Sequence, residues 1–286
     1  MQTARATDEP GARPAPEVHL LRFHRYDRAL HGLLMVSFLG LSLTGLPLLF
    51  ADHAWAHRMA RVLGGYGVTG ALHRVFATLL IACFLLHLGR VLHKLYAKKE
   101  LGILWGPDSL VPQPRDALQM AQHFRYFVGL GPRPRFDRFT YWEKFDYWAV
   151  FWGMAIIGGS GLLLWFPGPF ARLLPGWVFN VAFIVHGEEA LLATVFIFTV
   201  HFFNGHLRPE KFPMDTVIFT GRVTREELRH ERPAEYERLV RSGRIEEIAV
   251  PAARPRLRHA GYVVGTIAVA LGLLMVTLTV YALLTD

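Results

Sequence analysis

Residues 29–51 of the 286-residue chain read ALHGLLMVSFLGLSLTGLPLLFA and contain no Asp, Glu, Lys or Arg. Residues 147–166 and 260–283 lack these four residue types as well. Each stretch is long enough, as an α-helix, to cross a hydrocarbon core of about 30 Å. Two further apolar stretches, 71–92 and 177–203, are also long enough but carry histidine or glutamate. The sequence therefore predicts an all-α integral membrane protein, a helical bundle with five transmembrane helices.

The charged residues lie mainly between these stretches. The chain has 31 Lys and Arg against 23 Asp and Glu, a net charge of +8. Five basic residues fall in residues 1–28, ten between Arg90 and Lys144, and twelve between Arg208 and Arg258. This alternation follows the positive-inside rule and predicts a cytoplasmic N-terminus and an extracytoplasmic C-terminus. The positive charge then serves topology and contact with anionic membrane lipids, so we expect no nucleic-acid partner.

The apolar stretches and the basic segments between them predict how the chain is organised. A cytoplasmic tail (1–28) precedes a four-helix core (29–210), a polar cytoplasmic loop (211–258) and a fifth transmembrane helix (259–286). The core helices are expected at about 29–51, 70–95, 145–166 and 177–203. Asp116–Leu130 has the pattern of a short amphipathic helix at the membrane surface. Cys83 is the only cysteine, so neither a disulfide within the chain nor a C-x-x-C-H site for covalent haem exists.

Five of the fourteen histidines lie within or at the edge of the predicted helices: His31, His73, His87, His186 and His201. An ionisable residue inside a membrane helix indicates a functional site. His73 and His186 are expected near the outer face, and fourteen or fifteen residues separate them from His87 and His201 near the inner face. That spacing corresponds to roughly 21–22 Å along a helix. Two levels of paired imidazoles suit two stacked b-type haems better than zinc, which needs three or four converging ligands.

The pairing of the histidines is only partly determined by spacing. His73 with His186 is the one evident outer pair. For the inner level His201 can pair with His31 or with His87, and spacing alone favours His87. Fifteen residues between His186 and His201 overshoot the common helix face by about 60°, which either packing or a π-bulge could absorb.

Several of these positions resemble a known family. Tyr26–His31 (YDRALH) is similar to the D-R-x-x-H-W motif of the di-haem cytochrome b membrane subunits of formate dehydrogenase, nickel–iron hydrogenase and thiosulfate reductase. Leu72–Arg74 (LHR), and His186 with His201, match the same pattern. The stretches 201–215 and 141–148 resemble most the cytochromes b that serve multihaem c-type cytochromes. The chain departs from the pattern in having Gly32 after His31, where Trp is usual.

The resemblance implies a di-haem b core over residues 29–210. It implies that His31 and His201 ligate the inner haem, and His87 then lines a quinone pocket or ligates a third haem. Menaquinone or ubiquinone is the implied exchangeable substrate.

Other polar residues near these levels are candidates for contacts to haem propionates or a quinone, with anchoring at the membrane interface as the alternative. They are Arg74, Arg90, Glu188, Glu189, Glu143, Lys144 and His206. Arginines suit propionates through charge-assisted hydrogen bonds. A pair of partly buried carboxylates suits a proton acceptor beside a quinol.

The expected function is that of a membrane electron-transfer subunit in a respiratory complex of the bacterial cytoplasmic membrane. It would link the quinone pool to an extracytoplasmic redox partner, c-type or iron–sulfur, and would need that partner to complete a reaction. The chain has neither G-x-G-x-x-G nor a P-loop. The alternative is a proton or metal transporter that uses the same histidines as a relay.

Overall fold

The structure, a computed structural model, describes residues 17–285. Helices make up 72% of it, with almost no strand. Within the described residues, five helices are long and apolar enough to cross a membrane: Arg25–Leu49, Tyr66–Ala97, Tyr141–Trp165, Trp177–Leu207 and Pro255–Thr285. The all-α fold and the five membrane-length helices are thereby confirmed. Their ends differ from the predicted limits by four residues or fewer.

The first span is α1 (Arg25–Leu49), and the second is α3 (Tyr66–Leu92) continued by the π-helical η1 (His93–Ala97). The third consists of α5 (Tyr141–Gly153), η3 (Met154–Gly158) and α6 (Gly159–Trp165). The fourth consists of α8 (Trp177–Phe196), η4 (Ile197–His201) and η5 (Phe203–Leu207), and the fifth is α12 (Pro255–Thr285). The connections hold α2 (Ala54–Val62), η2 (Leu101–Ile103), α4 (Pro114–Phe127), α7 (Pro167–Ala171), α9 (Val217–Thr220), α10 (Arg225–Glu231) and α11 (Pro233–Arg241). Helix α4 confirms the predicted short helix after the second span.

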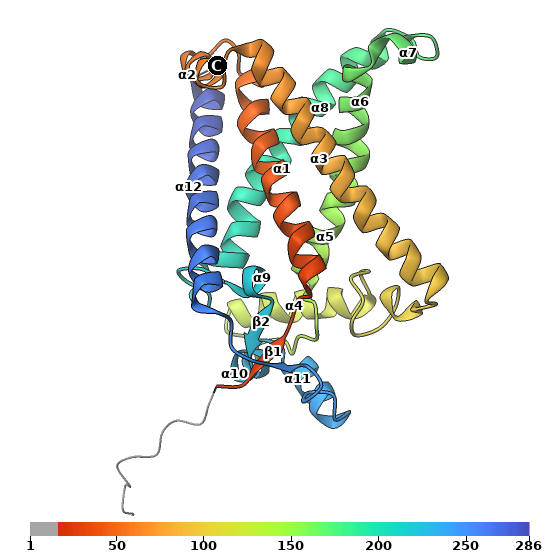
Figure 1. The fold of residues 1–286 in the computed structure, drawn as a ribbon, viewed down its shortest axis with the longest axis vertical. Helices are drawn as coiled ribbons and strands as arrows, with labels where there is room; N and C mark the ends of the chain where they lie inside the picture. The colour runs from red at the N-terminus through yellow and green to blue at the C-terminus, as the bar shows by residue number, and fades with distance from the viewer. Residues whose placement is uncertain (1–16, 286) are drawn as a thin grey trace, which may run out of the picture.

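The bundle has two distinct ends (Figure 1). Helices α2 and α7 and the end of α12 gather at one end, and α4, α10, α11 and the strands gather at the other. We refer to these as the α2 end and the sheet end.

Helices α1 and α3 approach closely because one face of α1 carries small residues. A Cβ atom at Gly40 would lie 2.4 Å from the ring of Phe76 on α3, so only glycine leaves room for that ring. Ser37 and Thr44 on the same face are buried and donate their hydroxyls to carbonyls of their own helix, each at 2.7 Å. Small residues that permit close backbone approach are the usual contact surface between membrane helices.

Helix α12 packs in the same way. Its buried residues recur every three or four positions and are mostly small: Gly261, Gly265, Ala268, Gly272, Met275, Thr279 and Ala282. Cβ atoms at Gly265 and Gly272 would overlap Met214 and Phe198 respectively, so the glycines receive these side chains. The fifth helix is therefore fitted to the bundle along a defined stripe.

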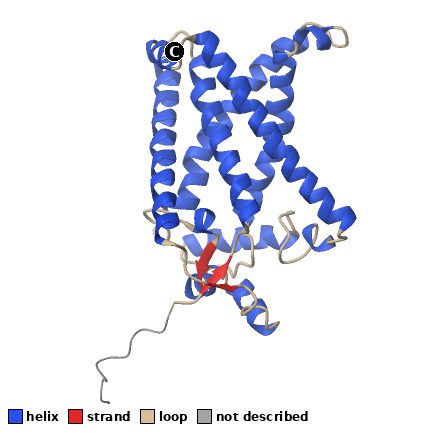
Figure 2. Ribbon diagram, in the orientation of Figure 1, coloured by secondary structure: helices blue, strands red, loops and turns tan. Residues whose placement is uncertain are grey.

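The segments expected to be a tail and a polar loop fold together at the sheet end (Figure 2). Strand β1 (His19–Leu21) pairs antiparallel with both β2 (Arg222–Thr224) and β3 (Ala249–Val250), in the order β2-β1-β3. Leu20 of β1 is buried in a small apolar core with residues of the loop, namely Val223, Leu228, Leu239 and Ile245. Residues 19–21 thus belong to a folded layer that the sequence did not reveal.

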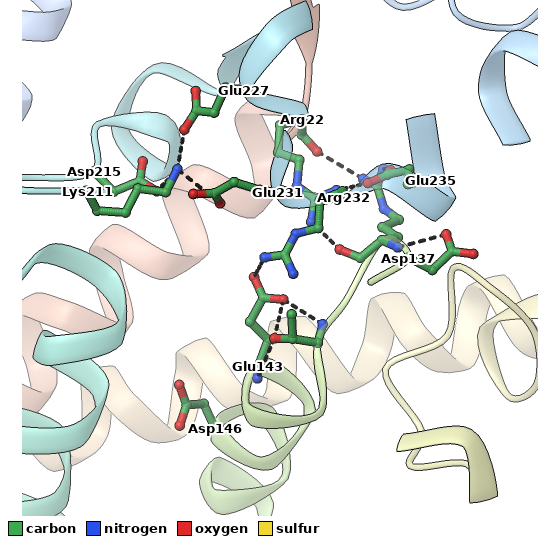
Figure 3. Close-up of polar contacts among 12 residues, drawn as sticks. Arg22, Asp137, Glu143, Asp146, Lys211, Asp215, Glu227, Glu231, Arg232 and Glu235 are labelled. Atoms are coloured by element: carbon green, nitrogen blue, oxygen red, sulfur yellow. Dashed lines mark hydrogen bonds and ion pairs between the residues drawn. The ribbon is translucent and has the colours of Figure 1, made fainter. Parts of the chain in front are cut away.

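Ion pairs join this layer to the membrane helices (Figure 3). Glu235, which is 2% exposed, accepts from Arg22 at 2.6 Å and from Arg138 at 3.1 Å. Burial opposes the charge of Lys211, but the carboxylates of Asp215, Glu231 and Glu227 outweigh it and raise the pKa of Lys211. The Lys211 pairs are local, whereas Glu235 lies 213 residues from Arg22 and 97 from Arg138 in the chain and so ties the polar layer to the segments that precede α1 and α5.

Candidate functional site

Two histidines from different helices face each other near the α2 end. His73 of α3 and His186 of α8 have ring centroids 6.3 Å apart, with the ring planes at 79°. Two imidazoles that ligate one metal ion from opposite sides, with bonds of about 2.0 Å, have centroids roughly 6.3 Å apart. The centroid separation of this pair equals that value; an edge-to-face contact of two unligated rings has a similar separation.

The hydrogen bonds of this pair determine which ring nitrogens remain free. His186 Nδ1 lies 3.0 Å from the carbonyl oxygen of Ile157, which can only accept, so Nδ1 donates. Thr44 donates its hydroxyl to a carbonyl, so its oxygen accepts from His73 Nδ1 at 3.0 Å. In both rings Nε2 then carries the lone pair and has no hydrogen bond to any residue in 17–285. Metal-ligating histidines typically donate their other ring N–H in this manner.

Two glycines make room for these rings. A Cβ atom at Gly45 of α1 would lie 3.1 Å from His73 Cε1, and one at Gly161 of α6 would lie 3.0 Å from His186 Cε1. The rings are therefore held against helix backbone on one side. The contacts lie on the Cε1 and Nδ1 edge of each ring.

A second group of histidines lies toward the sheet end. His31 of α1 is within electrostatic range of His201 and His206. His201 Nδ1 donates to Asp146 of α5 at 3.0 Å, which again leaves Nε2 as the lone-pair nitrogen. His206 Nδ1 is buried and has no partner among the described residues. The structure thus brings His201 toward His31 and gives it a carboxylate partner that the sequence analysis did not assign.

Of the two ways to absorb the extra residue before His201, packing or a π-bulge, the structure has a π-helical turn. Ile197–His201 forms a π-helix at the end of α8. A π turn accommodates one residue more than an α turn. The fifteen residues from His186 to His201 therefore turn the chain about as far as fourteen do in a regular helix.

His87 has different surroundings. Its Nε2, the nitrogen that is free in the other rings, lies 2.9 Å from the hydroxyl of Tyr147. Arg90, one turn on, is 4.1 Å from the ring centroid of Tyr26 and 3.5 Å from Asp27. The structure therefore gives both side chains protein partners on α1 and α5.

The acidic and basic candidates near the α2 end are more exposed. Glu189 accepts a hydrogen bond from the indole of Trp152 at 3.2 Å, whereas Glu188 is exposed. Arg74 is exposed beside His73 and within electrostatic range of it.

Glu143 and Lys144 are engaged in ion pairs at the start of α5 (Figure 3). Glu143 closes a capping box with Thr140 and accepts from Arg232 at 2.8 Å. Lys144 is 1% exposed and donates to both carboxylate oxygens of Asp116 on α4, at 2.8 and 2.9 Å. These contacts show a structural role for both residues in docking α4 and α11. The spacing from Asp116 to Lys144 in the chain carries no signal that would have predicted it.

Within residues 17–285, no group of three or more His, Cys, Asp or Glu side chains is placed to hold a metal ion. Comparison with known protein families found no match, and no curated protein is significantly similar to the chain.

Proposed function

We propose that the chain is a di-haem b electron-transfer subunit of a membrane complex. The observation that carries the proposal is the pattern of ring nitrogens. In His73, His186 and His201 the Nδ1 atom donates to a protein oxygen, and Nε2 is without a hydrogen bond to any described residue. Such a donor set fits two histidines per haem iron, one from each of two facing helices.

Each proposed site uses residues of particular elements. At the α2 end, His73 and His186 would hold one haem, with Thr44 and Ile157 fixing the ring tautomers. At the sheet end, His201 would hold the other, oriented by Asp146. A haem iron ligated by two histidines has no vacant coordination position, so the group supplies electron transfer rather than oxygen binding.

For the opposite ligand at the sheet end we propose His31. It is within electrostatic range of His201, and no described residue accepts or donates a hydrogen bond at its ring. His87, by contrast, has Nε2 against Tyr147. A quinone headgroup accepts hydrogen bonds, and the His87–Tyr147 pair keeps one N–H or O–H beyond its own hydrogen bond that would donate to it.

The wider assignment follows the same reasoning. We propose a four-helix di-haem core formed by α1, α3, α5–α6 and α8, with α12 packed against α1 and η4. By the positive-inside rule, we propose that the sheet end, which carries the basic loops, faces the bacterial cytoplasm. The subunit would take electrons from menaquinol or ubiquinol and deliver them to an extracytoplasmic redox partner, of the multihaem c-type in our proposal.

The test is a haem count on single variants. Purified chain from haem-replete cells should give two non-covalent haems b in the pyridine haemochrome assay, reducible by a quinol analogue. We expect His73→Ala and His31→Ala each to retain one. His87→Ala is the matched control and should retain two.

The outcomes separate the alternatives. Loss of a haem in His87→Ala but not in His31→Ala would overturn the proposed pairing. Three haems in the parent chain would make His87 a ligand. A folded chain without haem would refute the proposal and leave the transporter as the working hypothesis.

A further inference from the structure

A cavity of about 620 Å³ lies at the sheet end, between the ends of α1 and α12. Figure 1 shows α9 between the lower parts of these two helices. Four arginines line the cavity: Arg25, Arg28, Arg222 and Arg254. The remaining wall is largely apolar and includes Met35, Phe219, Leu257 and Val264. The cavity is therefore amphipathic.

The four positive charges are not neutralised by the protein. None of these arginines forms an ion pair with a carboxylate of residues 17–285. Arg28 donates to the carbonyl of Phe219, and its Nε is buried without a partner among the described residues. Arg222 donates to the carbonyl of Ala252 at 2.5 Å. Carbonyl contacts hold two of the guanidinium groups in place but supply no negative charge, so the cavity favours an anion.

The position of the four arginines relative to the membrane indicates which class of anion the cavity would bind. Arg25 begins the first span, and Arg254 immediately precedes the last. Met35 lies ten residues into the first span and Val264 ten residues beyond Arg254, about 15 Å along a helix in each case. The arginines thus lie at headgroup depth and the apolar wall extends toward the hydrocarbon. An uncharged quinone would not neutralise the charges of the four arginines.

We propose that this cavity binds an anionic phospholipid from the leaflet at which α1 begins. The phosphate would lie among the arginines, and an acyl chain would lie along the wall formed by Met35 and Val264. Basic pockets between membrane helices are suited to such headgroups. The proposal does not depend on haem, although His31 also lines the cavity.

The test compares lipid binding to two double variants of the whole chain. Arg25→Gln/Arg254→Gln removes the two cavity arginines whose side chains make no hydrogen bond within the described part of the chain. Arg229→Gln/Arg241→Gln removes the same charge from exposed sites on α10 and α11. Binding of phosphatidylglycerol and of phosphatidylethanolamine is measured by native mass spectrometry of the detergent-solubilised chain.

We expect the parent chain to prefer phosphatidylglycerol. The Arg25/Arg254 double variant should bind it about 25-fold more weakly, since each cationic side chain near an anionic headgroup strengthens binding about fivefold. The Arg229/Arg241 control should change by less than about threefold. An unchanged affinity in the Arg25/Arg254 variant, or an equal loss in the control, would overturn the proposal.

Two further measurements exclude other anions. Inorganic phosphate at millimolar concentration should not displace the lipid; displacement would indicate a site for free phosphate and refute the proposal. Haem content should be equal in both double variants; loss of haem with unchanged lipid affinity would assign the arginines to haem carboxylates instead. A chain without haem that still selects phosphatidylglycerol would refute the proposed function but support this inference.

Discussion

The buried pair of Lys144 and Asp116 allows a sharp test of how the sheet end is held on the helices. Lys144 is 1% exposed and its ammonium group contacts both carboxylate oxygens of Asp116. Lys144→Met keeps the length of the side chain and removes the charge. Asp116 would then remain buried without its counter-ion.

The expected cost can be worked out from these contacts. Removing one partner of a buried ion pair costs about 3–5 kcal/mol, because the other charge stays desolvated. Asp116 would still accept the backbone N–H of Gln113 at 2.6 Å, so we place the loss at the lower end, about 3 kcal/mol. For a chain of this size that loss lowers the melting temperature by roughly 6–12 °C.

The assay is thermal unfolding followed by tryptophan fluorescence, in one detergent. Asp116→Asn/Lys144→Met buries no charge and should recover most of the lost stability. Lys98→Met, at an exposed lysine, is the control and should change stability by no more than about 0.5 kcal/mol.

The reasoning is refuted if Lys144→Met has the same melting temperature as the Lys98→Met control. It is also refuted if Asp116→Asn/Lys144→Met is less stable than Lys144→Met. Haem content adds a second criterion. A loss of haem in Lys144→Met without a change in melting temperature would show that the lysine contacts a cofactor.

Two further predictions concern packing and pH. Gly40→Ala should destabilise the chain by about 1–3 kcal/mol, because its Cβ would overlap the ring of Phe76; Gly89→Ala, with nothing within 4 Å, should be neutral or slightly stabilising, and equal melting temperatures would contradict this account. Burial, followed by the charges of nearby arginines, lowers the pKa of His123 on α4. The imidazole of His123 therefore binds a proton more weakly in the folded chain than in the unfolded chain. The neutral imidazole contributes to stability above about pH 6.5, and this contribution is lost as the pH falls through the pKa of His123 in the folded chain. Melting between pH 7.5 and 5.5 should show a smaller acid-induced fall in His123→Phe than in the parent chain, and an equal fall would argue against it.

Part of the site was predictable because it depends on local spacing. His73 and His186 were expected at one depth and His201 at another, since residue number measures distance along a helix. A count of residues also showed the excess residue before His201, but not whether packing or the π turn at Ile197–His201 would absorb it. Which rings approach one another depends on helix rotation and tilt, which no count provides.

The roles of Glu143 and Lys144 were not predictable for the same reason. In the sequence they stand among aromatic residues at the start of a span, a pattern equally typical of interfacial anchors and of a quinone site. Their partners, Arg232 and Asp116, lie 89 and 28 residues away. Only folding of the two loops onto the helix ends brings these charges together.

The sequence by itself determined the five membrane-length helices and the two depths of histidine, because hydropathy and helical rise are properties of contiguous residues. The tertiary structure alone decided that β1 pairs with strands some 200 residues later, that Nδ1 of three histidines is bound to protein oxygens, and that four arginines meet in one cavity. These features arise from packing between segments remote in the chain, where the free energy of a contact depends on both partners and on the burial they share.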